Sequence, residues 1–195
     1  MCQEVERLAS DPKACSKRNN TIFKKNGETM FRFLAFTVSF FLATSAIAEI
    51  KFPELTSDDL NGRSMNLPAD LPGETTIIFV AYKQRQQPKI DAWVKRLGLT
   101  ETGGPAWVEM PVVGKGAAIF RSFVDNGMRS GITSQKMRAR TITIYSSRSA
   151  FNRAMGLKGR NDIYVLLVDR DGSVREIIRG DVSEEKVDQL RDAYP

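Results

Sequence analysis

Few residues of this 195-residue chain have a type and spacing that could support chemistry. Ser183 and Lys186 have the S-x-x-K spacing of serine–lysine nucleophiles, but a helix-capping serine followed by a solvated lysine explains the same pattern. Residues 114–116 (Gly-Lys-Gly) match only a fragment of a phosphate-binding loop, because the full GxxxxGK[ST] pattern and its preceding strand are missing. We therefore predict no catalytic residue from either motif.

The chain lacks the residue types that most often do chemistry. Histidine is absent, which excludes a Ser-His-Asp triad, a histidine general base and a histidine-ligated zinc. Cysteine occurs only at Cys2 and Cys15, and two cysteines cannot form a zinc cluster alone. We predict neither a metal site nor a cofactor.

Residues 30–48 have the pattern of a secretory signal peptide. A methionine and one arginine precede an apolar run that is shorter than the ~20 residues needed to span a bilayer. Ala46-Ile47-Ala48 forms an A-x-A cleavage site, so we expect cleavage after Ala48 and a periplasmic or secreted protein. An uncleaved N-terminal anchor is the alternative. Because signal peptides seldom follow so long a polar leader, we expect residues 1–29 not to be translated.

The predicted mature chain, residues 49–195, contains no cysteine, because Cys2 and Cys15 both precede it. A domain of this size buries about 68–70% of its unfolded surface and needs no disulfide to hold a core. Thiol oxidoreductase and cysteine peroxidase activities are therefore excluded for the mature chain.

Hydrophobic patterning predicts that residues 49–195 form a single α/β domain. Residues 75–81 and 163–168 are continuous apolar runs, as in strands buried on both faces. Ile90, Trp93 and Leu97 share one face of a helix that ends at a glycine. The remaining predicted elements are a hairpin at 60–67, strands at 107–110, 140–145 and 174–178, and helices at 118–127, 148–155 and after Ser183.

This order of elements resembles the thioredoxin-like superfamily. The resemblance depends on the hairpin 60–67 leading into 75–81, and on Asp169-Arg170-Asp171-Gly172-Ser173-Val174 followed by Gly180 and the last helix. It implies a mixed sheet flanked by helices, with an inserted segment. Within the superfamily the chain looks most similar to a cysteine-less branch resembling the mitochondrial ATP-synthase assembly factor family. That similarity implies a protein that accompanies a membrane subunit rather than a redox catalyst.

The resemblance also locates the superfamily's redox site in this sequence. In thioredoxins the strand matching 75–81 delivers a Cys-x-x-Cys pair to a helix start, where the helix dipole lowers the thiol pKa. Gln84 and Gln87 take the two cysteine positions here, and Ile163 takes that of the superfamily's cis-proline. These polar residues at a helix start form a candidate binding corner: Lys83, Gln84, Arg85 and Gln87.

Positive charge is concentrated in the middle of the chain. Residues 112–160 contain ten basic residues and one acidic residue, a net charge of +9, whereas residues 49–111 and 161–195 are net acidic. Such a block can bind an anionic membrane surface or an acidic protein, or it can simply be spread over several solvated faces. No nucleic acid is expected without an aromatic-interleaved basic motif. The candidate basic surface consists of Arg129, Arg138, Arg140, Arg148 and Arg153.

Taken together, these features predict an exported, non-redox, thioredoxin-like module that binds or assembles a partner. The expected partner is a membrane protein or an anionic membrane surface. Two alternatives stay open. One is an accessory protein of a periplasmic redox or antioxidant system without thiol chemistry of its own. The other is an enzyme that uses polar residues other than cysteine.

Overall fold

A computed structural model describes residues 49–101 and 103–195. The leader and signal-peptide predictions concern residues 1–48 and lie outside these described residues. The described residues all belong to one compact unit. The described part of this unit contains a five-stranded mixed sheet, in the order β5-β4-β3-β6-β7, and a separate two-stranded hairpin, β1-β2.

The sheet is built outward from its central strand, β3 (Thr75–Ala81), in which every residue is buried. β4 (Ala106–Val113) lies parallel to β3 on one side, and β6 (Tyr164–Asp169) lies antiparallel on the other. The edges are β5 (Ile144–Tyr145), parallel to β4, and β7 (Val174–Arg179), antiparallel to β6. The apolar runs that predict β3 and β6 therefore mark the two adjacent strands in the middle of the sheet.

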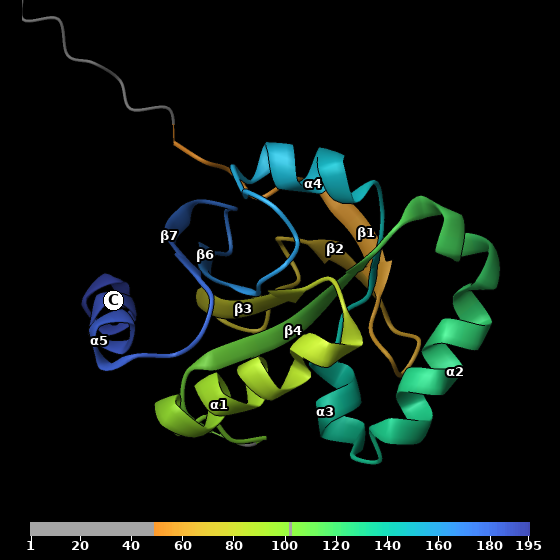
Figure 1. Ribbon diagram of the computed structural model, residues 1–195, viewed down its shortest axis with the longest axis horizontal. Helices are drawn as coiled ribbons and strands as arrows, with labels where there is room; N and C mark the ends of the chain where they lie inside the picture. The colour runs from red at the N-terminus through yellow and green to blue at the C-terminus, as the bar shows by residue number, and fades with distance from the viewer. Residues whose placement is uncertain (1–48, 102) are drawn as a thin grey trace, which may run out of the picture. The chain divides into compact units, whose positions relative to one another are not determined.

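Two hydrophobic cores cover the two faces of the sheet, because successive side chains of a strand point to opposite sides. Ile78 and Val80 of β3 belong to a core with the hairpin and α4 (Arg148–Ala154). Ile77 and Phe79 belong to a core with α1 (Gln87–Leu97) and α5 (Glu184–Ala193). Figure 1 shows α4 and the hairpin on one side of the sheet and α1 on the other. The buried residues of both cores lie within residues 52–190, and Ala193 and Tyr194 pack against the second core, so the fragment 49–195 contains both cores whole and can fold as a unit.

A hairpin forms as predicted, with strands β1 (Leu55–Asp58) and β2 (Ser64–Leu67), but its first strand lies before the predicted range 60–67. The Asp59 carboxylate accepts hydrogen bonds from the backbone N–H groups of Asn61 and Arg63, at 2.8 and 3.0 Å. Gly62 has a φ of +86°, which a glycine adopts without strain. The turn therefore depends on an aspartate one residue before the predicted start, as well as on the Asn-Gly pair.

The inserted segment between β4 and β5 differs most from the prediction. A 3₁₀ helix, η2 (Lys115–Phe120), leads into α2 (Arg121–Gly131), and a short helix, α3 (Gln135–Ala139), follows. In Figure 1, α2 runs along one edge of the domain. The predicted strand 140–145 is interrupted, because Thr141 and Ile142 form only isolated bridges, to Glu109 of β4 and to Asp59. Only Ile144 and Tyr145 pair as a strand with β4.

Candidate functional site

The predicted binding corner lies where β3 passes into α1. A 3₁₀ turn, η1 (Gln84–Gln86), follows Lys83 and continues directly into α1, whose first turn contains Pro88. Proline suits this position because the first helical N–H groups have no partner within the helix. The corner residues Gln84, Arg85 and Gln87 are exposed and Lys83 is half-buried, so all four lie at this turn and each is at least partly accessible.

The residue that holds this corner together is Gln86, which the sequence does not single out. Its side chain is only 2% exposed. Its Oε1 atom accepts hydrogen bonds from the backbone N–H groups of Tyr82 and Lys83, at 2.7 and 3.0 Å. Its Nε2 atom donates to the Arg160 carbonyl at 3.2 Å. The side-chain amide of Gln86 therefore stabilises the backbone of the turn and also links the turn to the loop before β6.

A buried carboxyl group lies directly beneath the corner. Glu109 of β4 is 5% exposed, and both of its carboxylate oxygens accept hydrogen bonds from Gln87 Nε2, at 3.1 and 3.2 Å. Burial raises the pKa of Glu109, an effect that the Gln87 hydrogen bond partly offsets. The sequence offers one signal for it, since Glu109 is the single charged residue in the predicted strand 107–110.

The loop before β6 is fixed beside the corner by further buried polar contacts. The Tyr82 hydroxyl donates to Asn152 Oδ1 at 2.5 Å, and Asn152 Nδ2 donates to the Gly159 carbonyl at 2.9 Å. Lys83 Nζ donates to Asn161 Oδ1 at 2.9 Å. Burial raises the pKa of Tyr82, so this hydroxyl stays protonated as a donor. The corner is consequently a preformed surface rather than an open loop.

The five arginines of the candidate basic surface fall into two groups. Three hold the inserted segment together by donating to backbone carbonyls. Arg129 Nε bonds Leu60 O at 2.5 Å, and Arg138 Nε bonds Ile132 O at 2.6 Å. Arg140 bonds Trp107 O at 2.9 Å and lies over the Trp107 ring, 5.1 Å from its centroid. These guanidinium groups have a structural use in addition to their charge.

The other two arginines of that set, Arg148 and Arg153, lie on α4. Arg148 Nε donates to the Val112 carbonyl at 3.2 Å, and its guanidinium lies alongside Gly114. Arg153 is exposed. The structure thus brings Arg129, Arg138 and Arg140 together in the inserted segment and places the remaining pair on a different helix.

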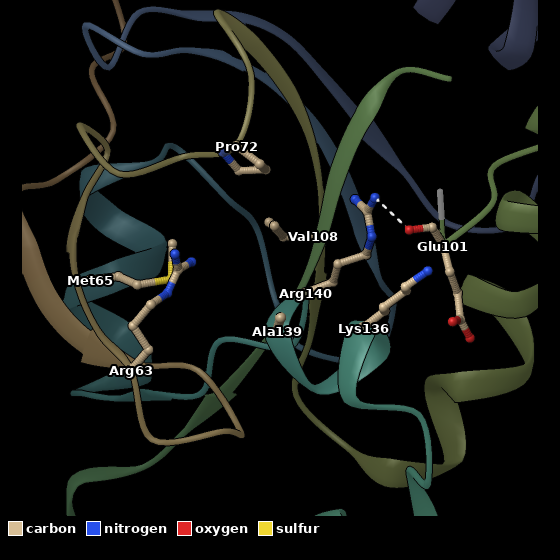
Figure 2. A pocket seen from close by; sticks show the side chains of 8 residues that line it. All are labelled: Arg63, Met65, Pro72, Glu101, Val108, Lys136, Ala139 and Arg140. Carbon is tan, nitrogen blue, oxygen red and sulfur yellow. Dashed lines mark hydrogen bonds between the residues drawn. The ribbon is translucent and has the colours of Figure 1, made fainter. Parts of the chain in front are cut away.

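A shallow surface cavity of about 260 Å³ opens beside the inserted segment. Figure 2 shows Arg140 and Lys136 extending toward Glu101, with Arg63 and Met65 on the opposite side. Among the described residues no group of three or more histidine, cysteine, aspartate or glutamate side chains could hold a metal ion. In the same part of the chain, no helix is long and apolar enough to cross a bilayer.

Neither a protein family model nor a curated protein matches the chain. Solved structures do match it. One is a protein of Aquifex aeolicus VF5 that is described by a proposed role in electron transfer. It is 15% identical to this chain, with a TM-score of 0.53, and the match covers 75% of this chain and 97% of that one. BsSco, named as a member of the Sco family of cytochrome c oxidase assembly proteins, is 12% identical, with a TM-score of 0.53 over 75% and 92% of the two chains.

A thioredoxin from Streptococcus pneumoniae strain TIGR4, an exposed lipoprotein, is also similar; it is 12% identical, with a TM-score of 0.47 over 73% of this chain and 100% of that one. Identities this low show the fold alone.

The peptide bond before Ile163, at the superfamily's cis-proline position, is not among the cis bonds of the described residues. The mixed sheet, its strand order and the likeness to BsSco establish that the chain has a thioredoxin-like α/β fold.

Proposed function

We propose that this protein is an exported, non-redox, thioredoxin-like module that binds or assembles a partner. The observation that supports this most directly is the junction between β3 and α1, where the superfamily's dithiol would lie. Gln84 and Gln87 occupy those two positions, and residues 49–195 contain no cysteine. A carboxamide neither forms a disulfide nor ionises to a nucleophile, so this junction is suited to hydrogen bonding.

The environment of the corner favours binding over catalysis. Gln86 uses its entire amide to fix the turn, and Gln87 is bonded to Glu109. The exposed groups that remain are the Gln84 amide and the cationic side chain of Arg85, beside the start of α1. Helix starts favour negative charge, and arginine forms paired hydrogen bonds with carboxylates. The corner therefore suits a partner segment that presents carboxylates or backbone carbonyls.

An assembly role agrees with the sequence resemblance to the mitochondrial ATP-synthase assembly factor family. BsSco, which has the same fold, is itself named for assembly of a membrane complex. We propose a membrane-protein client, with an ATP-synthase membrane subunit as the specific expectation. We also propose that residues 30–48 direct export to the periplasm or the cell exterior.

Affinity capture from the membrane fraction of the source organism tests this function. Tagged wild-type chain should retain a membrane protein, and recovery of an ATP-synthase subunit would support the assembly role. Arg85→Glu should lose that client, because it reverses the charge of the corner. Lys95→Glu is the matched control, since Lys95 is an exposed cation on α1 away from the corner. Equal recovery by both variants would contradict the role of the corner.

A further inference from the structure

The inserted segment exposes large apolar side chains to an unusual degree. Ile119, Phe120 and Phe123 are 84, 64 and 81% exposed. They lie within five residues of one another, at the end of η2 and in the first turn of α2. Among the described residues only one other large hydrophobic side chain, Ile50, is exposed, and its exposed fraction is 38%. Single exposed hydrophobic residues are ordinary, whereas a contiguous group marks a contact surface.

The orientation of α2 explains why this apolar cluster faces outward. Arg121, Asp125 and Arg129 are spaced by four residues and so share one face of the helix. Arg121 forms an ion pair with Asp58 at 3.2 Å, and Arg129 Nε donates to Leu60 O at 2.5 Å.

Asp125 completes this polar attachment, because it accepts a hydrogen bond from the Tyr145 hydroxyl at 2.6 Å. α2 is thus attached to the domain by these polar contacts, with Val124 and Met128 half-buried beside them, and none of its residues is buried. Phe123 projects from the opposite face, since two residues turn the helix by roughly 200°. Ordinary surface helices place their large apolar residues on the protein, whereas α2 leaves Phe123 exposed.

Two cations lie near the start of η2, the 3₁₀ helix that carries Ile119 and Phe120. Lys115 is exposed at the start of η2, and the Arg148 guanidinium lies alongside Gly114, the residue before it. Asp125 is the only acidic residue in 112–160, where the net charge is +9, and its carboxylate is bonded to Tyr145. An apolar cluster with cations at its border matches the charge and depth profile of an anionic bilayer surface.

We propose that Ile119, Phe120 and Phe123 insert into the headgroup region of an anionic lipid bilayer while Lys115 and Arg148 contact lipid phosphates. This surface is separate from the corner at α1, so the inference does not depend on the proposed function. A second copy of the chain is a poorer occupant, because three side chains provide far less than the roughly 1,200 Å² that specific protein interfaces bury. The segment thus positions the domain on a membrane without a spanning helix.

Sedimentation with lipid vesicles tests the proposal on the fragment 49–195, which lacks the apolar run of residues 30–48. Wild-type fragment should bind vesicles of phosphatidylcholine mixed with phosphatidylglycerol and should bind pure phosphatidylcholine vesicles weakly. Phe120→Ser with Phe123→Ser should weaken binding by about a hundredfold, since each buried phenyl ring contributes about tenfold. Lys115→Glu should weaken it by about fivefold or more, because one basic residue near an anionic surface contributes about that factor.

Two matched controls accompany these variants. Ile50→Ser removes an exposed apolar side chain elsewhere, and Lys95→Glu makes the same charge change on α1; both should bind like wild type. Circular dichroism establishes that each variant is folded. Equal binding to neutral and anionic vesicles, or unchanged binding by the double phenylalanine variant, would overturn the proposal. A third result would also overturn the proposal: the wild-type fragment does not bind vesicles but associates with itself, and Phe123→Ser abolishes that association. This result would assign the surface to a second copy of the chain.

Discussion

Replacing Gln86 with alanine should destabilise the domain far more than any other glutamine substitution at the corner. The change removes three hydrogen bonds, two accepted from the Tyr82 and Lys83 amides and one donated to the Arg160 carbonyl. A neutral hydrogen bond contributes about 1 kcal/mol, and a buried amide left without a partner costs about 1–3 kcal/mol. Tyr82 is buried, whereas Lys83 is half-exposed and can bond water. We therefore expect the free energy of unfolding to fall by about 3 kcal/mol.

Urea denaturation of the fragment 49–195 measures this loss, with Gln84→Ala as the matched control. Gln84 is exposed, so its replacement should change the free energy of unfolding by less than about 0.5 kcal/mol. Amide hydrogen exchange gives a second measurement, because Gln86→Ala should remove the protection of the Tyr82 amide. If Gln86→Ala were as stable as Gln84→Ala and the Tyr82 amide stayed protected, the structural account of the corner would be wrong.

Three further predictions address Glu109, the dithiol positions and the last helix. Burial raises the pKa of Glu109 above its ordinary 4.5, so the folded state holds this proton more tightly and wild-type stability falls as pH rises through that window. Glu109→Gln should therefore gain stability relative to wild type between acid and neutral pH in urea titrations; a difference independent of pH would contradict this. The double variant Gln84→Cys with Gln87→Cys should form an internal disulfide, detected by thiol titration, whereas two persistently free thiols would refute the assigned correspondence. Ser183→Ala should cost about 1 kcal/mol in urea denaturation, because Ser183 Oγ caps α5 by accepting from the Lys186 amide; an unchanged midpoint would argue against the cap.

Elements with a strong apolar pattern, either a continuous run or a helical spacing, can be predicted from the sequence because the pattern indicates which side chains are buried. The seven buried residues of β3 and the helical spacing of Ile90 and Trp93 in α1 are examples. Gly98 ends α1 in the left-handed conformation, with a φ of +64°, as a glycine stop signal predicts. Trp93, on the predicted apolar face of α1, and Trp107, in the predicted strand 107–110, are both fully buried.

The inserted segment could not be predicted to the same degree, because polar contacts rather than apolar burial determine its structure. Residues 140–145 have the composition of a strand, but Arg140 and Thr141 are held by the end of α3. α3 is five residues long and has a single local signal, the capping serine Ser134. The outward direction of Phe123 also depends on one ion pair and two hydrogen bonds between α2 and residues distant in sequence, which no local pattern contains.

At the candidate site, the surface residues were predictable and their supports were not. The resemblance locates Gln84 and Gln87 by their distance from a recognisable strand. Gln86 lies between them with the same side chain, and only the fold distinguishes the buried glutamine from the two exposed ones. Glu109 is distant in sequence from the corner and reaches it because β4 pairs in parallel with β3.

The most direct test of the central claim, that this thioredoxin-like domain binds without thiol chemistry, is an insulin-reduction assay on the fragment 49–195. The assay compares this fragment with a thioredoxin and with the double variant Gln84→Cys and Gln87→Cys. We predict that the native fragment reduces insulin no faster than the reductant alone, since it contains no cysteine. Measurable turnover by the native fragment, above that background, would contradict the account.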